Sequence, residues 1–225
     1  MRAHPHLQLV TEATPLLTED GLAWVAAAMR AGIDSVQIRE RGATGRMLLE
    51  AAQRILPIAS SIGIVVTIHD RVDIALALLP TRRATPGGLL VPVGVHLAGH
   101  SLPVAMVRRL LTLPLVGVSV HSVDDARAAE RDGADYVTFG HVFPSNSHPD
   151  RSPQGLDRLR DVVLAVDIPV FAIGGIDASK AHDVLSTGCA GVAVISAILD
   201  APDPAAATRE LRAALDRGFS RQPTP

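Results

Sequence analysis

The sequence predicts a single (β/α)8 barrel, the fold also called a TIM barrel. Short runs of β-branched residues alternate along the 225 residues with longer segments of helical spacing, which is the pattern of a parallel sheet wrapped by helices. Eight such strand and helix units fit this length, at the compact end of the range for the barrel. We therefore expect one domain over residues 1–219 and a disordered tail over residues 220–225.

The predicted strands are short and rich in valine, isoleucine and leucine. They are Leu7–Thr11, Ser35–Arg39, Gly63–His69, Gly94–Leu97, Leu115–Val118, Tyr136–Phe139, Pro169–Ile173 and Gly191–Ile195. The predicted helices follow in turn and are Gly21–Ala31, Thr44–Ser60, Arg71–Leu79, Pro103–Leu110, Val123–Asp132, Gln154–Val166, Ala178–Thr187 and Pro204–Arg217. The segment from Pro80 to Val93 interrupts this alternation with prolines, arginines and a Gly-Gly pair, and predicts a long irregular loop.

Local signals mark the helix ends. Side chains that can accept a hydrogen bond from a free first-turn N–H precede three of the helices: Thr18 with Asp20, Ser122, and Asp177 with Ser179. Glycines stand where three helices should stop: Gly32, Gly133 and Gly188. Each glycine lies shortly before the next strand, as the short connections of such barrels require.

The composition excludes several classes of function. Lysine plus arginine number 21 against 23 for aspartate plus glutamate, a formal charge of −2, so we expect no nucleic-acid partner held by a basic face. Aromatic residues make up only 3%, too few for a base-stacking platform. The single cysteine, Cys189, cannot form an internal disulfide, which fits a reducing cytoplasm. No apolar run is long enough for a bilayer, so we expect no membrane partner.

The loops after the last two strands carry the strongest functional signal, because barrel active sites form at the carboxyl ends of the strands. Gly174 and Gly175 follow the seventh strand and allow backbone N–H groups to approach an anion. Ile195 and Ser196 follow the eighth strand and add amides and a hydroxyl. These four residues predict a bound phosphate and hence a phosphorylated small molecule. The alternative is that the glycines serve only a tight turn.

The second strand ends in residues suited to an anionic substrate. Gln37 and Arg39 lie two residues apart, so both side chains can point into the barrel mouth. A guanidinium there suits a carboxylate or a second phosphate. An ion pair of Arg39 with Glu40 or Glu12 is the alternative.

Histidines end several strands, and His141 is the candidate for chemistry. It follows the sixth strand directly after Gly140, which lets the chain turn so that the imidazole faces the mouth. An imidazole can donate and accept a proton near pH 7, as an isomerisation without a cofactor requires. His121 after the fifth strand is the rival, and Ser119 on the same segment is a candidate substrate contact.

Two further residues have weaker claims. Asp70 follows the third strand and could bind Mg²⁺ or pair with Arg71, but one carboxylate is a poor magnesium site without a partner. Cys189 lies in a connection at the opposite face of the barrel, so we assign it no catalytic role.

Six motifs in this order resemble the thiamine-phosphate synthase superfamily, from the first strand to the last helix. They are Gln37-Ile38-Arg39-Glu40-Arg41, Asp70-Arg71-Val72-Asp73-Ile74-Ala75, Val95-His96-Leu97, Val118-Ser119-Val120-His121-Ser122, Ala134-Asp135-Tyr136-Val137-Thr138-Phe139-Gly140-His141-Val142-Phe143 and Ala172-Ile173-Gly174-Gly175-Ile176. The superfamily has two main branches, the synthases and the TenI-like thiazole tautomerases.

Departures from the synthase pattern concern charged groups. The synthases resemble one another in having an Asn-Asp pair at the position of His69-Asp70 in this chain. They also have a second metal-binding aspartate at the position of Ser101. The loop 140–148 lacks their diphosphate-binding lysine, and Arg41 replaces a further lysine. Losing a Mg²⁺ ligand and a cation would leave a diphosphate leaving group poorly neutralised.

The same segments resemble the tautomerase branch. Its Gly-His-Val-Phe segment carries a catalytic histidine that corresponds to His141, and its Ser-Val-His-Ser run matches residues 119–122. This resemblance implies an isomerase without a cofactor, which aromatises the ylidene tautomer of a carboxythiazole phosphate by moving one proton. The phosphorylated thiazole carboxylate would then be its partner, with Arg39 available for the carboxylate. We expect a thiazole tautomerase of thiamine biosynthesis.

Two alternatives remain from the sequence. The first is a thiamine-phosphate synthase, a Mg²⁺-dependent transferase that joins a thiazole phosphate to a pyrimidine diphosphate, with Asp70 as a metal ligand. The second is a barrel without catalysis that binds a thiamine-pathway phosphate or a protein partner and acts as a regulator. The sequence leaves both a monomer and a homodimer open, because no exposed apolar helix stripe indicates an interface.

Overall fold

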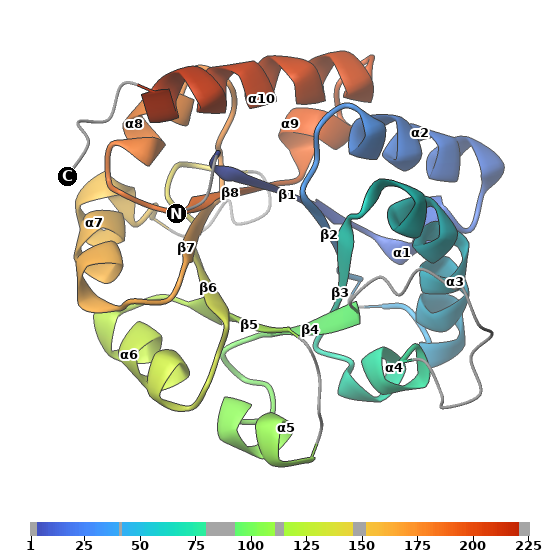
Figure 1. Ribbon diagram of the computed structural model, residues 1–225, viewed down its shortest axis with the longest axis horizontal. Coiled ribbons are helices and arrows are strands. Elements are labelled where there is room, and N and C mark those ends of the chain that lie inside the picture. The colour runs from blue at the N-terminus through green and yellow to red at the C-terminus, as the bar shows by residue number, and fades with distance from the viewer. Residues whose placement is uncertain (1–3, 41, 80–92, 111–114, 146–151, 221–225) are drawn as a thin grey trace.

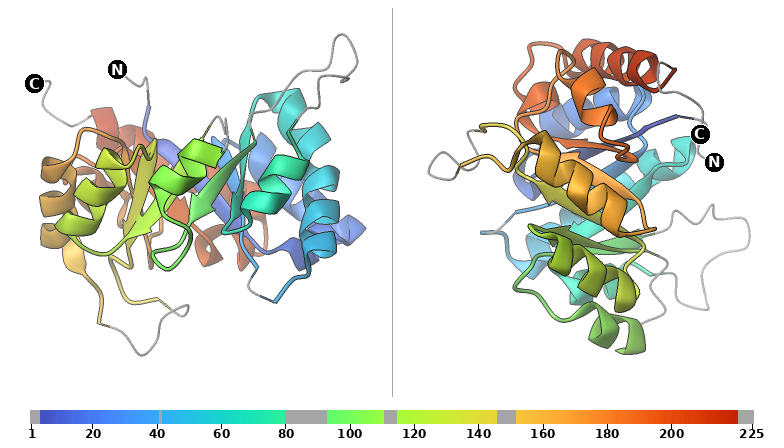
Figure 2. Two further views of the ribbon diagram at one scale, coloured as in Figure 1. Left: turned by 90° about the horizontal axis from the view of Figure 1, so that it is seen from below. Right: turned by 90° about the vertical axis from the view of Figure 1, so that its left-hand side faces the viewer.

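A computed structural model describes residues 4–40, 42–79, 93–110, 115–145 and 152–220. In it, β1 to β8 are parallel and close into a barrel in the order of the chain (Figure 1). The helices surround the barrel on its outer side, as two further views show (Figure 2). The predicted fold class is confirmed.

The eight strands start and end within two residues of the bounds predicted for them. They are β1 His6–Thr11, β2 Ser35–Ile38, β3 Val65–His69, β4 Val93–Leu97, β5 Val116–Val120, β6 Tyr136–Gly140, β7 Val170–Ile173 and β8 Gly191–Val194. Their burial on both faces matches the near-continuous apolar runs of a parallel sheet.

All eight predicted helices are present. They are α2 Glu19–Arg30, α3 Gly45–Ile62, α4 Val72–Ala77, α5 Val104–Leu110, α6 Val123–Arg131, α7 Gly155–Ala165, α8 Ala181–Leu185 and α10 Pro204–Ser220. Two further helices of four residues, α1 Ala13–Leu16 and α9 Ser196–Leu199, were not predicted, because one turn is too short to show a helical period. The helix α10 includes Ser220, which the sequence had assigned to the tail; residues 221–225 and the predicted loop at 80–92 lie outside the described ranges.

The local signals at helix ends are confirmed in most places. Thr18 and Ser122 accept hydrogen bonds from first-turn N–H groups at 3.1 Å. The predicted cap of α8 is wrong: Asp177 accepts from the N–H and the hydroxyl of Ser179, and the helix begins only at Ala181 after Lys180. The three predicted stop glycines all have positive φ.

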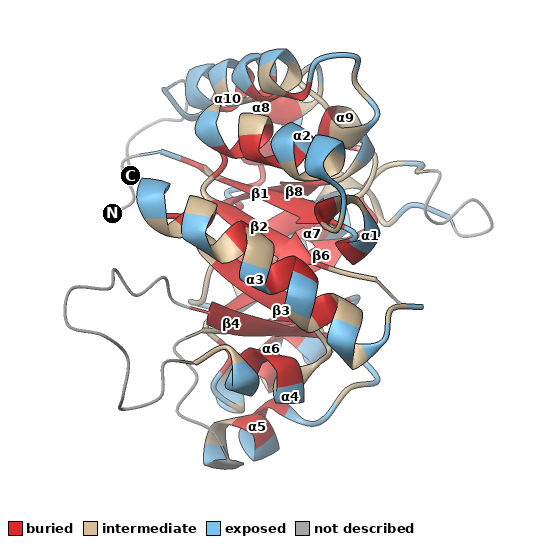
Figure 3. Ribbon diagram, turned by 90° about the vertical axis from the view of Figure 1, so that its right-hand side faces the viewer, coloured by how far each residue is buried: buried red, intermediate tan, exposed pale blue. Residues whose placement is uncertain are grey.

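The core has two parts. An apolar layer lies between the outer face of the strands and the helices, whose outward faces are exposed (Figure 3). The inside of the barrel is more polar, with buried side chains that include Gln8, Thr67, His96 and Thr138. Within the described ranges, none of the helices has the length and apolar composition needed to cross a membrane.

Candidate active site

One large cavity of about 1240 Å³ opens where the carboxyl ends of the strands meet the loops that follow them. Every residue that the sequence predicted for the site lines it: Gln37, Arg39, Asp70, Ser119, His121, His141, Gly174, Gly175, Ile195 and Ser196. The closed barrel brings them together, because all eight strands point the same way. Their individual roles remain predictions.

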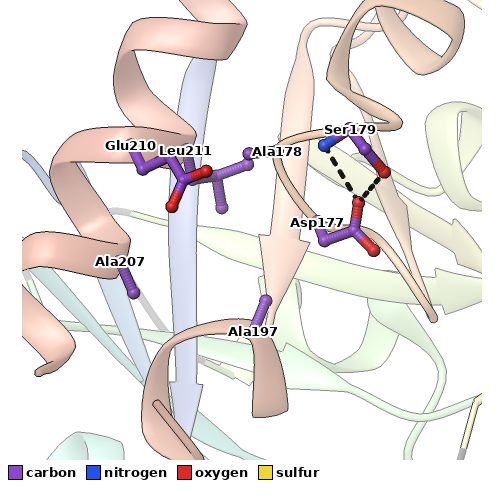
Figure 4. A pocket seen from close by; sticks show the side chains of 7 residues that line it. All are labelled: Asp177, Ala178, Ser179, Ala197, Ala207, Glu210 and Leu211. Atoms are coloured by element: carbon purple, nitrogen blue, oxygen red, sulfur yellow. Dashed lines mark hydrogen bonds between the residues drawn. The ribbon is translucent and has the colours of Figure 1, made fainter. Parts of the chain in front are cut away.

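A smaller cavity of about 250 Å³ lies in the outer layer (Figure 4). It is bounded by α9, α10 and the segment that follows β7, and its polar side chains are Asp177, Ser179 and Glu210. In Figure 4 the carboxylate of Asp177 is turned to Ser179, which binds it at 2.6 Å through the hydroxyl. None of the predicted site residues lines this cavity, so the large cavity is the candidate active site.

We call Gly174, Gly175, Ile195 and Ser196 the glycine side of the mouth. Gly174 has φ +101°, and a Cβ there would lie 2.3 Å from the Cβ of His141. Gly175 has φ +65°, and a Cβ there would lie 2.3 Å from the carbonyl oxygen of Pro144. The glycines therefore do more than permit a turn: they let the chain after β6 lie against the loop after β7.

His141 is held in that contact. It is 8% exposed, and the N–H of the next residue, Val142, donates to the carbonyl of Ile173 at 2.9 Å. His121 reaches the same segment from β5, because its Nδ1 donates to the carbonyl of Gly140 at 2.9 Å. Both predicted histidines thus lie beside the glycine side, with His121 fixed against the β6 backbone.

A buried polar chain that sequence reasoning missed runs beneath the mouth. His96, 1% exposed, binds the hydroxyl of Tyr136 through Nδ1 and that of Ser119 through Nε2, both at 2.9 Å. Burial lowers the pKa of His96 to about 3 and raises the pKa of Tyr136 to about 12, so both are neutral at pH 7. His96 thereby fixes the hydroxyl of Ser119 at the cavity wall. Its sequence signals are the motif Val95-His96-Leu97 and its place one residue before the end of β4, on the inward face by the period of two.

Gln37 and His69 form a second pair in the wall. The amide nitrogen of Gln37 donates to Nδ1 of His69 at 3.0 Å, and the rings of His69 and His96 stack with centroids 5.8 Å apart. Glu40, weighed above as a partner of Arg39, accepts from both the N–H and the hydroxyl of Thr14 at 2.8 Å. Gln37 on β2 is thus held in place by His69 on the neighbouring strand β3.

We call Arg39, Asp70, Arg71 and His100 the charged side of the mouth. The predicted alternative of an Asp70–Arg71 pair is wrong, because Arg71 binds Asp73 through two nitrogens at 2.8 and 2.6 Å. The carboxylate of Asp70 accepts a hydrogen bond from the hydroxyl of Ser101. Its other oxygen lies 3.7 Å from Nε2 of His100. The charged side is therefore built from side chains, whereas the glycine side is built from backbone.

Lys180 is a second cavity residue that sequence reasoning missed. Its Nζ donates to the carbonyl of Gly175 at 2.8 Å and to Asp177 at 2.6 Å. Cys189, by contrast, lies in the connection between α8 and β8 and does not line the cavity. Burial raises the pKa of its thiol to about 11, which disfavours the reactive thiolate.

Comparison with known proteins places the chain in a family. Residues 7–198 match the family described as thiamine monophosphate synthase. The thiamine-phosphate synthase of Roseiflexus castenholzii is 41% identical over 189 residues, which cover 83% of this chain and 78% of that protein. The thiamine-phosphate synthase of Chloroflexus aurantiacus is 39% identical over 92% of this chain and 91% of that protein. A solved structure, the thiamine phosphate pyrophosphorylase of Pyrococcus furiosus, superposes with a TM-score of 0.81 at 33% identity, over 95% of this chain and 96% of that one.

These relatives correct the expected function. The prediction of a thiazole tautomerase, an isomerase, is wrong, because the similar proteins are named for the synthase, a transferase. The prediction gave decisive weight to a few loop positions around His141 and Ser101, whereas the likeness to the synthases extends over more than four fifths of the chain. The proton-transfer role predicted for His141 belonged to the tautomerase reaction and is withdrawn with it.

Proposed function

The chain belongs to the thiamine monophosphate synthase family, and from this premise we propose that it is a transferase that joins a thiazole phosphate to a pyrimidine carrying a diphosphate. In such a transfer a ring nitrogen of the thiazole forms a bond to the exocyclic carbon of the pyrimidine. The bond from that carbon to the diphosphate oxygen breaks, and diphosphate leaves with the bonding electron pair.

The size of the cavity is the observation that supports this reaction best. A pocket for one small ligand occupies roughly 300 to 1,000 Å³. The cavity here measures about 1240 Å³ and is shared by loops from all parts of the barrel, which is room for two substrates at once. A reaction of one ligand would not need this volume.

The two sides of the mouth suit two anions. β3 and β7 lie across the barrel from each other (Figure 1), so the charged side and the glycine side face one another. On this proposal Gly174, Gly175, Ile195 and Ser196 receive the phosphate of the thiazole through backbone amides and a hydroxyl.

The charged side then receives the diphosphate, whose negative charge grows as it leaves. The guanidinium of Arg39, next to Gln37, is placed to offset that charge. Ser119, His121 and His141 lie between the two sides and contact the rings. These contacts hold the reacting atoms in line, which is the main requirement of a displacement between two bound substrates.

The test is formation of thiamine phosphate from the two substrates by the purified protein, with diphosphate released in equal amount. The reaction is run once with MgCl₂ and once with EDTA, so that transferase activity is detected whether or not it requires Mg²⁺. We expect turnover by the wild type, and a loss of about 100-fold or more in kcat/KM for Arg39→Ala, the usual effect of removing a group that stabilises developing charge. Arg209→Ala, on the exposed face of α10, is the matched control and should retain full activity.

Absence of product in both conditions would refute the transferase. Binding of thiazole phosphate without turnover would then favour the second alternative, a regulator that binds without catalysis.

A further inference from the structure

Asp70, where the synthase pattern implies a metal ligand, has an unusual backbone. Among the described residues that are not glycine it is the one with positive φ, at 62°. Two hydrogen bonds of 2.8 Å hold this turn, from the N–H of Asp70 to the carbonyl of His96 and from the N–H of Arg71 to that of His69. Aspartate tolerates this conformation better than most residues. The turn fixes where the Cβ of Asp70 points, and the partners of its carboxylate define what the position can bind.

The partners of Asp70 are hydrogen-bond donors. The hydroxyl oxygen of Ser101 accepts from the N–H of Ala98 at 2.7 Å, so its own proton is directed to the first oxygen of Asp70. The imidazole of His100 lies 3.7 Å from the second oxygen. A cation site needs further oxygen acceptors around its carboxylate, and here a hydroxyl donor and a ring nitrogen occupy those places.

The other carboxylates of the cavity are engaged in the same way. Glu40 accepts from Thr14, and Asp177 accepts from Lys180 and Ser179. Mg²⁺ demands six oxygens in near-ideal octahedral geometry and takes one or two carboxylates for the purpose. The residues present do not fit it.

Three basic side chains line the cavity together with Asp70: Arg39, Arg71 and His100. Arg71 is the next residue, and its guanidinium is held by Asp73 at 2.6 Å. His100 is exposed at the rim, and Arg39 lines the same part of the cavity. An anion that enters here can accept hydrogen bonds from guanidinium and imidazole groups directly, without a bridging metal.

We propose that the charged side binds a diphosphate group through Arg39, Arg71 and His100 without a divalent cation, and that Ser101 removes the metal position by binding Asp70. The identification of the anion as a diphosphate rests on the proposed function. The geometry of Asp70 and Ser101 does not, since it concerns only what this carboxylate can hold. The pair lies 31 residues apart in the sequence and in contact in space.

The first experiment uses Mn²⁺ alone as a probe of the magnesium position, with free Mn²⁺ followed by electron paramagnetic resonance. The wild type and Ser101→Asn should bind no Mn²⁺ at concentrations up to about 1 mM, the weak end of protein sites for divalent cations. Ser101→Asp places a second carboxylate beside Asp70, and we expect it to bind Mn²⁺ with a Kd at least about tenfold below that concentration. Saturable Mn²⁺ binding by the wild type would overturn the proposal, whether or not the variants fold.

The second experiment measures binding of inorganic diphosphate by calorimetry. We expect the same affinity for free, uncomplexed diphosphate, within about twofold, in EDTA and in MgCl₂, and a loss of about tenfold in His100→Ala, as for one charge-assisted contact. His182→Ala, on the exposed face of α8, is the matched control. Binding that disappears in EDTA, or no binding in either buffer, would contradict the proposal. Diphosphate bound in EDTA by a protein with no synthase turnover would refute the proposed function and leave this inference standing.

Discussion

The two sides of the barrel mouth are built on different principles. On the glycine side, Gly174 and Gly175 take positive φ and leave no room for a Cβ, so backbone meets backbone. On the charged side, backbone hydrogen bonds hold the turn at Asp70 and Arg71, but both residues also bind through their side chains, to Ser101 and Asp73. A backbone site tolerates almost no change of residue, whereas a side-chain pair can exchange its partners and keep the fold. We therefore expect substitutions on the glycine side to affect folding more strongly than substitutions on the charged side.

The largest expected effect is that of Gly174→Ala on stability. The new Cβ would lie 2.3 Å from the Cβ of His141, at a backbone φ of +101°. We expect a loss on the order of 3 to 5 kcal/mol in the free energy of unfolding, from overpacking and backbone strain together. Urea unfolding of the wild type and the variant measures it.

Gly63→Ala is the matched control for this prediction. Gly63 ends α3 with φ +74°, and a Cβ there meets nothing within 4 Å. Its substitution should cost only the backbone strain, about 1 kcal/mol. Equal losses in the two variants would mean that close packing against His141 is not what requires a glycine at 174.

A smaller effect is expected beneath the charged side, where His96 is buried in neutral form. Its pKa of about 3, lowered from 6.5 by burial, means that the unfolded chain binds a proton between pH 6.5 and 3 that the folded chain does not. Stability is therefore full above pH 6.5 and falls as the pH is lowered, by about 1.4 kcal/mol for each unit. His96→Gln keeps hydrogen-bonding groups for Tyr136 and Ser119 and should lack this slope.

The measurement is the free energy of unfolding of the wild type and of His96→Gln from pH 7.5 to 4.5. His182→Gln, at an exposed position on α8, should follow the wild type. Parallel curves for the wild type and His96→Gln would show that His96 takes up a proton in the folded state.

The sequence was sufficient where backbone geometry decides the structure. The strands follow from β-branched runs, and the glycine side follows from two glycines between a buried strand and a helix. The rim residues follow from the rule that parallel strands end together. Each of these features depends on neighbours in the chain, so a local pattern reveals it.

The sequence was insufficient where contacts join distant segments. His96 reaches Tyr136 over 40 residues and Ser119 over 23, and although each residue lies in a recognisable motif, no local pattern shows that they meet. The helices α1 and α9 are single turns without a period. The reaction itself was predicted wrongly, because a loop such as that around His141 supplies a chemical group and does not determine which substrates the remaining loops admit.

The smallest expected effect tests the glycine side as a backbone site. On the proposed function, Ser196→Ala removes one exposed hydroxyl while the amides of Gly174 and Gly175 remain, so the KM for thiazole phosphate should rise only about two- to fivefold, as for one neutral hydrogen bond. Ser186→Ala, at the exposed residue directly after α8, is the control and should leave the KM unchanged. A loss as large as the one expected for Arg39→Ala would mean that a side chain also dominates the glycine side. The glycine side would then depend on a side chain as strongly as the charged side does, and the proposed difference between the two sides would be wrong.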